Sequence, residues 1–259
     1  MKKAVFFDID GTIWDEHMRI PKSAAEAIGA LRAAGNYAFL CSGRSRACIR
    51  NEKLLALGFD GIVAACGAHM ERDGDIFYEN LLTDAQVSRV LKVVQENRLH
   101  AVLEGPRYIY VEEEAFLEDP YMVYLRRELG ADLRVITGTK QFEINKLSAF
   151  LNGAGLAKVT EELGEEFAVI AHAGQLVEIV PAGHSKATGI AKMCEAYKIA
   201  HEDTYAFGDS ANDLEMLTFA AHGIAMGNGT KEAKQAAEFV TSSLQEDGIA
   251  QGLRHYGLI

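Results

Sequence analysis

The feature that most constrains the fold is the regular order of short apolar runs and longer amphipathic stretches between Lys3 and Ala65. The first run, Lys3 to Phe7, is apolar on both sides of an extended chain, which is typical of a central strand in a parallel sheet. Two more strands are predicted at Tyr37 to Cys41 and at Gly61 to Ala65, with helices from Pro21 to Ala34 and from Arg46 to Leu57 between them. This βαβαβ order predicts parallel strands, so the loops that follow them share one edge of the sheet.

The pattern changes from about Ala68, where the stretches His69 to Arg72 and Asp75 to Tyr78 flank Asp73-Gly74, a strong hairpin signal. Pairs of strands then alternate with helices, which predicts an α+β layer with an antiparallel sheet, and the first pattern resumes at His184. We expect an α/β chain with a parallel-sheet core, residues 1–82 and 182–259, and an inserted α+β domain, residues 83–181. The elements expected in the insert are helices at 84–97, 114–129 and about 156–163, and strands at 101–104, 108–112, 133–136, 142–151, 167–171 and 176–180. After it we expect helices at 184–197, 213–219, 231–237 and from 247, and strands at 204–207, 222–225 and 239–240.

Charge and composition exclude several classes of protein. Lys and Arg total 26 against 37 Asp and Glu, a net charge of −11, and such a field repels the phosphates of DNA or RNA. The four cysteines form no CxxC pair, and acidic residues follow the N-terminus too soon for a signal peptide. No apolar run approaches the roughly 20 residues that a membrane span needs. We therefore expect a reduced, cytoplasmic protein with no nucleic-acid or membrane partner.

Four polar motifs could carry chemistry. They are Asp8-Ile9-Asp10-Gly11-Thr12, Ser42-Gly43-Arg44, Lys186, and Gly208-Asp209-Ser210-Ala211-Asn212-Asp213. Each has a plain structural interpretation when taken alone: a turn, a loop, a surface lysine or a helix cap. Three of them, however, follow predicted parallel strands directly, and ligands of open α/β sheets bind beyond the carboxyl ends of the strands. This shared position favours a single site.

In this order and spacing, the motifs resemble those of the haloacid dehalogenase superfamily of phosphatases, and the whole chain is similar to its Cof-type branch, subclass IIB. The resemblance implies a Rossmann-like core with an inserted cap domain. It also implies Asp8 as the nucleophile, Asp10 as the general acid and base, and Lys186 as a stabiliser of charge. The further roles that it implies are phosphate binding by Ser42, Gly43, Arg44, Lys186 and Asn212, and metal binding by Asp8, Asp10, Asp209 and Asp213, with Asp213 in a supporting position.

The chemistry of these residues agrees with that expectation. Four acids that converge on one edge would repel a phosphate dianion, so a divalent cation and Lys186 are needed to reverse the local field. Oxygen ligands fit Mg²⁺, and no Cys/His cluster has the spacing of a zinc site. The expected reaction is hydrolysis of a small phosphorylated metabolite, a sugar or cofactor phosphate, through an aspartyl-phosphate. The oligomeric state stays open between monomer and homodimer.

Other functions are also compatible with these motifs, and two residues differ from the usual pattern of the Cof-type branch. A phosphomutase of the mannose-phosphate type would pass the phosphoryl group to a sugar hydroxyl, and a receiver-like or non-catalytic metabolite-binding module would release no phosphate. Cys66 stands where the branch usually has Asn, and His184 stands where a small or apolar residue is common. We expect a buried filler role for Cys66 and no catalytic role for His184. Ordinary surface or sheet positions are expected for Glu104, Arg107, Tyr108, Glu143, Lys146 and His172, although each could contact a substrate.

Overall fold

The computed structural model describes residues 2–111, 120–136 and 142–259, and these fall into two compact units. Unit 1 comprises Met1–Gly43, Arg50–Tyr78 and His184–Ile259. Unit 2 comprises Arg44–Ile49 and Glu79–Gly183. The chain therefore enters unit 2 twice, first through a short loop that the sequence pattern did not separate from the core.

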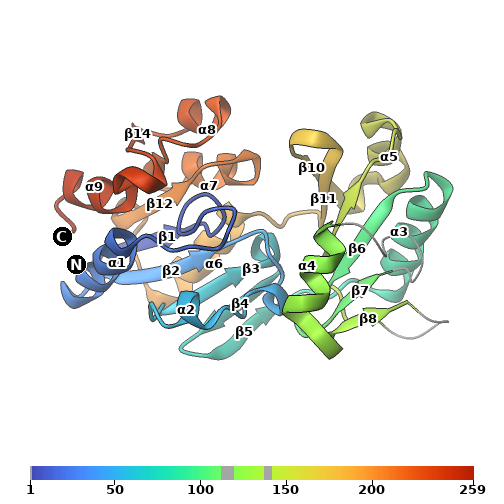
Figure 1. Cartoon of the computed structure of the whole chain (residues 1–259), viewed down its shortest axis with the longest axis horizontal. Helices are drawn as coiled ribbons and strands as arrows, with labels where there is room; N and C mark the ends of the chain where they lie inside the picture. Colours follow the sequence, from blue (N-terminus) through green and yellow to red (C-terminus); the bar gives the residue numbers. More distant parts are fainter. Residues whose placement is uncertain (1, 112–119, 137–141) are drawn as a thin grey trace. The chain divides into compact units, whose positions relative to one another are not determined.

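Unit 1 is built on an eight-stranded sheet in the order β14-β13-β12-β1-β2-β3-β4-β5 (Figure 1). The pairs from β14 to β3 are parallel, and β4 is antiparallel to β3, so the hairpin after Ala68 extends this sheet. The strands are β1 (Ala4–Phe7), β2 (Tyr37–Cys41), β3 (Gly61–Ala64), β4 (His69–Arg72), β5 (Asp75–Glu79), β12 (Thr204–Gly208), β13 (His222–Ala225) and β14 (Phe239–Val240). Every residue of β1 is buried, as expected for a strand covered on both faces.

Helices cover both faces of this sheet. Ala4 and Phe6 of β1 share a core cluster with Ile190 and Met193, because alternate residues of a strand point to the same face. On the other face, the Cα of Gly252 packs closely against the ring of Phe207. The helices of unit 1 are α1 (Lys22–Ala33), α2 (Glu52–Leu55), α6 (Lys186–Tyr197), α7 (Leu214–Phe219), α8 (Lys231–Ala236) and α9 (Gly248–His255).

The helix predicted from Arg46 to Leu57 is wrong. A single 3-10 turn, Arg46–Cys48, is followed by a break, and α2 begins only after Asn51. The Asn51 side chain accepts hydrogen bonds from the backbone of Lys53 and Leu54, so it caps a new helix rather than continuing the old one. The turn belongs to unit 2, where Ala47 is buried against Val102 and Ile109.

Unit 2 contains a six-stranded sheet in the order β10-β11-β9-β6-β7-β8. The strands are β6 (His100–Glu104), β7 (Ile109–Val111), β8 (Leu133–Val135), β9 (Lys146–Phe150), β10 (Phe167–Ala171) and β11 (Leu176–Pro181), and the helices are α3 (Asp84–Glu96), α4 (Pro120–Leu129) and α5 (Leu156–Leu163). The pairs are antiparallel as predicted, except that β7 and β8 are parallel. Between these two strands the chain includes α4, and parallel neighbours require such a crossover connection.

Two predicted elements of unit 2 differ in length. The strand expected at 142–151 begins only at Lys146, and the residues before it form no regular structure. The first part of the helix expected at 114–129 and the end of the strand expected at 108–112 lie outside the described residues.

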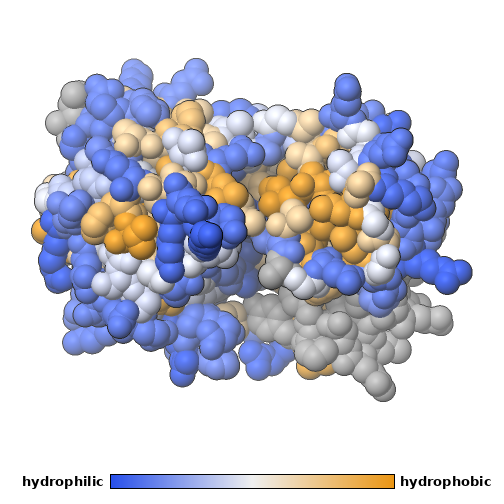
Figure 2. All heavy atoms as spheres, turned by 90° about the horizontal axis from the view of Figure 1, so that it is seen from above, coloured by the Kyte–Doolittle hydropathy of each residue, from blue (hydrophilic) through white to orange (hydrophobic). Residues whose placement is uncertain are grey.

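Figure 2 shows hydrophilic residues over much of one face, with smaller apolar areas between them. No disulfide joins the four cysteines, all of which lie among the described residues. None of the helices in the described ranges is both long enough and apolar enough to cross a bilayer.

Candidate active site

Parallel strands bring the predicted motifs to one edge of the unit 1 sheet. Phe7 pairs with Phe207 on one side and with Leu40 on the other, so the next residues of the three strands follow side by side. Asp8 comes directly after β1, and Asp209 comes directly after β12. Ser42 follows β2 at the same edge.

Asp8 and Lys186 form a buried ion pair at this edge. Strand alternation gives Asp8 the same face as Ala4 and Phe6, the face that α6 covers. Lys186 is the first residue of α6, and its Nζ donates to Asp8 Oδ1 at 2.6 Å. Lys186 is 1% exposed and Asp8 is 4% exposed, so water screens this pair only weakly.

Asp213 holds the lysine and the loop before α7 together. Its Oδ1 accepts from Lys186 Nζ at 2.6 Å, and its Oδ2 accepts from the backbone N–H groups of Asp209 and Ser210 at 2.8 and 2.9 Å. Both carboxylate oxygens are therefore used within the chain, and the side chain is fully buried. This geometry suits a residue that fixes the others in place.

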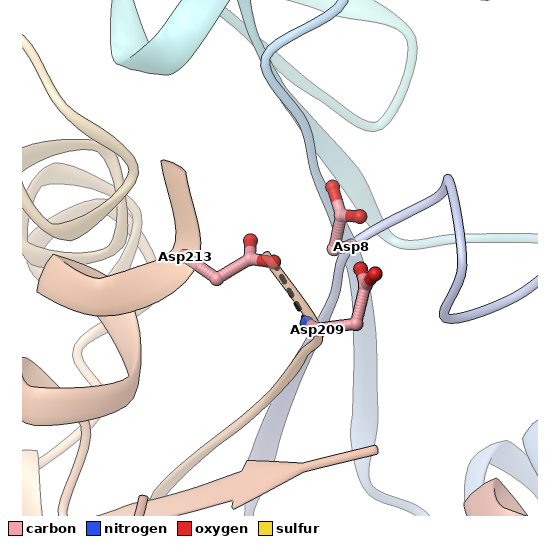
Figure 3. Close-up of side chains that lie close together, drawn as sticks. All are labelled: Asp8, Asp209 and Asp213. Carbon is pink, nitrogen blue, oxygen red and sulfur yellow. Dashed lines mark hydrogen bonds between the residues drawn. The ribbon is translucent and has the colours of Figure 1, made fainter. Parts of the chain in front are cut away.

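The carboxylates of Asp8, Asp209 and Asp213 form one group in which a ligand oxygen of each lies within 4.8 Å of the others (Figure 3). The Asp209 carboxylate packs against Gly11. A Cβ on Gly11 would overlap this carboxylate, and the backbone φ of Gly11 is +76°. Only glycine meets both conditions without strain. Thr12 Oγ1 donates to Asp209 Oδ1 at 3.4 Å.

The group carries more negative than positive charge. Three carboxylates face one ammonium group, and burial raises the pKa of Asp8 well above its usual range, an effect that Lys186 opposes and that Asp213 strengthens. Burial also raises the pKa of Asp209 to about 7, with Asp213 adding to the shift. Burial alone would lower the pKa of Lys186, but Asp213 and Asp8 raise it well above its usual range. Hard oxygen donors with an excess of negative charge fit a divalent cation such as Mg²⁺.

Asp10 takes a different position from Asp8. It is exposed, it lies outside the group of three acids, and its Oδ1 accepts from Trp14 Nε1 at 2.8 Å. Asp10 and Asp209 line a pocket of about 500 Å³, together with Gly11, Asp15, Glu16, Ser210, Asn228, Ser243, Leu244 and Gln245. The pocket gives a small molecule access to this edge of the sheet.

The expected phosphate-binding residues do not all lie in one unit. Ser42 is buried, its N–H donates to Val63 O, and its carbonyl accepts from Cys66 N. Gly43 is the last residue of this segment in unit 1, whereas Arg44 belongs to unit 2. Asn212 lies in the turn before α7, where its Oδ1 accepts from Ser210 Oγ.

Two residues near the site had no predicted role. Trp14 is 1% exposed, and the sequence pattern did not connect it with Asp10. Asn228 donates through Nδ2 to Gly11 O and accepts at Oδ1 from Leu244 N, so it ties the glycine turn to the C-terminal part of unit 1. Asp10 and Trp14 are four residues apart in the sequence, and this short spacing could have indicated the contact between their side chains.

The structure describes the two positions, Cys66 and His184, where the sequence differs from the residues usual in the family that it resembles. Cys66 is buried with φ 51° and ψ 41°, in the left-handed region. Asn tolerates that region better than most residues, which explains why it would suit this position. Tyr78 and His184 are the residues of unit 1 that flank the long segment of unit 2, and Tyr78 Oη lies 2.8 Å from His184 Nε2.

Three residues of unit 2 that could contact a substrate, Glu104, Lys146 and His172, lie together around Glu178. Lys146 Nζ lies 2.6 Å from Glu178 Oε2 and 3.5 Å from Glu104 Oε1, and His172 Nε2 lies 2.9 Å from Glu178 Oε1. Burial alone would raise the pKa of Glu178, but Lys146 and His172 hold it well below its usual range. The charges compensate one another, as in a structural ion-pair network. Arg107 and Glu143 are exposed, and Tyr108 lies under the guanidinium of Arg134.

The chain is similar to known proteins over nearly its whole length. Residues 5–253 match the family described as haloacid dehalogenase-like hydrolase. The chain is 31% identical to YkrA of Bacillus subtilis (strain 168), over 99% of this chain and 98% of that protein. It is 28% identical to the 5-amino-6-(5-phospho-D-ribitylamino)uracil phosphatase YitU of the same organism, over 97% and 96% of the two chains. Among solved structures it is similar to the subclass IIB sugar phosphatase BT4131, with a TM-score of 0.86, 27% identity and full coverage of both chains.

Proposed function

The chain belongs to the haloacid dehalogenase-like hydrolases, and on that premise we propose that it is a Mg²⁺-dependent phosphomonoester hydrolase in which Asp8 is the nucleophile. Phosphatase activity on small phosphorylated compounds is the activity of its relatives in this superfamily. The observation that carries the proposal is the buried group of Asp8, Asp209 and Asp213 with Lys186 at the carboxyl edge of the parallel sheet.

The donor chemistry of this group supports a metal site. Asp8 and Asp209 would hold the cation, and Asp213, whose oxygens are bonded to Lys186 and to the backbone at 209 and 210, would support it. Asp10, in the turn that follows Asp8, would add to the site. A bound Mg²⁺ would neutralise phosphoryl oxygens and orient them for attack.

The residues of the chain would then share the reaction as follows. Asp8, rigid at the end of a buried strand, attacks phosphorus in line and forms an aspartyl-phosphate. Lys186 stays charged between Asp8 and Asp213 and stabilises the negative charge that develops on the phosphoryl oxygens. Ser42, Gly43 and Asn212, at or near the same edge, would bind these oxygens.

Asp10 is suited to proton transfer. Its carboxyl group is exposed to the pocket, so it can protonate the leaving alkoxide and then activate the water that hydrolyses the aspartyl-phosphate. A phosphomutase would use the same residues but would hand the phosphoryl group to a second hydroxyl. Release of inorganic phosphate, measured with one substrate present, separates the two reactions.

The substrate class we propose is a phosphorylated sugar, alditol or related cofactor precursor. The similarity to the sugar phosphatase BT4131 and to YitU, which acts on a phosphoribitylamino-uracil, supports this range. A panel should include sugar phosphates, alditol phosphates, the YitU substrate, pyridoxal phosphate and flavin mononucleotide. The measurement is phosphate release with and without Mg²⁺, and activity that is undiminished in metal-depleted protein would refute the proposed mechanism.

The assignment of Asp8 and Asp10 is tested with two matched variants. Asp8→Asn lacks the attacking oxygen, so no phosphoenzyme should form. Asp10→Asn keeps the nucleophile and should lose about 10² to 10⁴ in rate, less with a good leaving group such as p-nitrophenolate. Mass spectrometry after acid quench should find an adduct of ~80 Da, one phosphoryl group, on Asp8. An adduct on Asp10, or one that still forms in Asp8→Asn, would reverse the assignment.

A further inference from the structure

Trp14 and Asp10 are joined by a side-chain hydrogen bond, in addition to the packing of the indole ring. Trp14 Nε1–H donates to Asp10 Oδ1 at 2.8 Å, and the indole ring is 1% exposed while the carboxyl group is exposed. Trp14 is the only tryptophan of the chain. A buried ring therefore presents its single polar atom to the side chain of an exposed residue.

Backbone bonds fix the two residues in the same turn. Trp14 N donates to Ile9 O at 3.1 Å, Gly11 N donates to Trp14 O at 2.9 Å, and Asp10 and Trp14 form an isolated β-bridge. Asn228 Nδ2 donates to Gly11 O at 2.8 Å and so anchors the turn from outside. The relative position of the ring and the carboxyl group is thus set by the backbone and by the hydrogen bond together.

We infer that Trp14 is a positioning residue that orients the Asp10 carboxyl group toward the leaving oxygen of the substrate. An indole N–H donates and does not accept, so it can engage Oδ1 only as an acceptor and thereby fixes the orientation of the carboxyl group. Holding one carboxylate rotamer reduces the freedom that must be lost before proton transfer, and small errors of placement reduce rates strongly. This inference rests on the proposed function, because it concerns the proton-transfer step of that reaction.

The test compares two leaving groups. An alkyl phosphate such as a sugar phosphate needs a proton on its leaving oxygen, whereas p-nitrophenyl phosphate leaves with little help. Trp14→Phe keeps an aromatic ring in the buried position but removes the N–H donor together with one ring of the indole. Its kcat should fall roughly 10- to 100-fold on the alkyl phosphate and less than about 3-fold on p-nitrophenyl phosphate. In the Asp10→Asn background, Trp14→Phe should cause no further loss on the alkyl phosphate.

Ile13→Val is the matched control. Ile13 is fully buried in the same turn, and its side chain has no polar atom, so its truncation should affect both substrates equally. Equal losses on the two substrates in Trp14→Phe, or multiplied losses in the double variant, would show that Trp14 only fills space. If the wild-type protein releases no phosphate from either ester, the proposed function itself fails. If the wild-type protein is active and Trp14→Phe loses activity equally on both esters, only the inference about Trp14 fails.

A spectroscopic measurement needs no Trp14 variant. The single indole N–H gives one cross-peak in a ¹H–¹⁵N spectrum of the intact protein, and replacing its carboxylate acceptor by an amide in Asp10→Asn should move that peak downfield or upfield by a clearly resolved shift. The peak should stay close to its wild-type position in Ile13→Val. An unmoved peak in Asp10→Asn would contradict the contact on which the inference depends.

Discussion

Lys186 Nζ lies 2.6 Å from Asp8 Oδ1, although 178 positions separate the two residues in the sequence. One residue comes directly after a central strand, and the other is the first residue of a helix that begins after the long segment of unit 2. Strand alternation points Asp8 at the face that this helix covers, so the fold of unit 1 makes the pair without any local contact between the two segments.

Removal of the metal should make stability depend on pH. The pKa of Asp209 is raised from 3.8 to about 7, so between these values the folded protein binds more protons than the unfolded chain, and the free energy of unfolding falls as pH rises. In EDTA, the melting temperature should therefore fall as pH rises from about 4 to about 7 and level off above that. Mg²⁺ should restore it most strongly above pH 7, where the carboxylates are charged.

Thermal melts followed by circular dichroism measure this effect, and Asp209→Asn is the control. The variant should show a weaker dependence on pH in this window and a smaller shift with Mg²⁺. If Mg²⁺ raised the melting temperature equally in both proteins, Asp209 would not be a metal ligand.

Lys186→Met should strongly destabilise the protein and abolish turnover. The change leaves Asp8 and Asp213 buried without their cation, and breaking a buried pair in this way costs about 3 to 5 kcal/mol. Adding Asp213→Asn should recover part of that loss, because one of the two buried charges disappears. Urea denaturation measures both changes.

The control is Lys192, in the same helix. Lys192 lies over the Tyr78 ring, and Lys192→Met should cost less than about 1 kcal/mol. Similar losses for the two lysines would contradict the role of burial.

Position 66 should tolerate Asn better than Val. Cys66 has φ 51°, and a β-branched side chain is strained in the left-handed region, by about 1 to 2 kcal/mol. Cys66→Val should therefore lose at least about 1 kcal/mol more than Cys194→Val, a buried cysteine within α6. Chemical denaturation of the three variants checks this order. Equal losses at positions 66 and 194 would mean that the backbone conformation is not limiting.

Replacement of residues 79–183 by a short linker should leave unit 1 folded. The ends of the excised segment are close, since Tyr78 Oη lies 2.8 Å from His184 Nε2, and all of Asp8, Lys186, Asp209 and Asp213 lie in unit 1. We expect a cooperative melt and a near-UV circular dichroism signal, hydrolysis of p-nitrophenyl phosphate, and loss of discrimination among phosphorylated metabolites. A protein with no cooperative melt would show that unit 1 depends on unit 2.

Some properties could be predicted from the sequence because their signals are local. Apolar runs of strand length gave β1, β2 and β12 close to their observed bounds, and the hairpin signal at Asp73-Gly74 marked the end of parallel pairing. The motif around Asp8 and the motif around Asp209 each follow a strand directly, so their meeting at one edge could be inferred from the rule for parallel sheets. Hydrophobic periodicity and strand order carry this information without any knowledge of packing.

Only the tertiary structure decided how the side chains share their contacts. It assigned both oxygens of Asp213 to Lys186 and to the loop before α7, and it placed the indole of Trp14 on Asp10. It also put Arg44 in a different unit from Ser42 and ended the expected helix at the Asn51 cap. These outcomes depend on burial and on partners far away in the chain, where a competition between hydrogen bonds and desolvation is settled by the whole fold rather than by neighbouring residues.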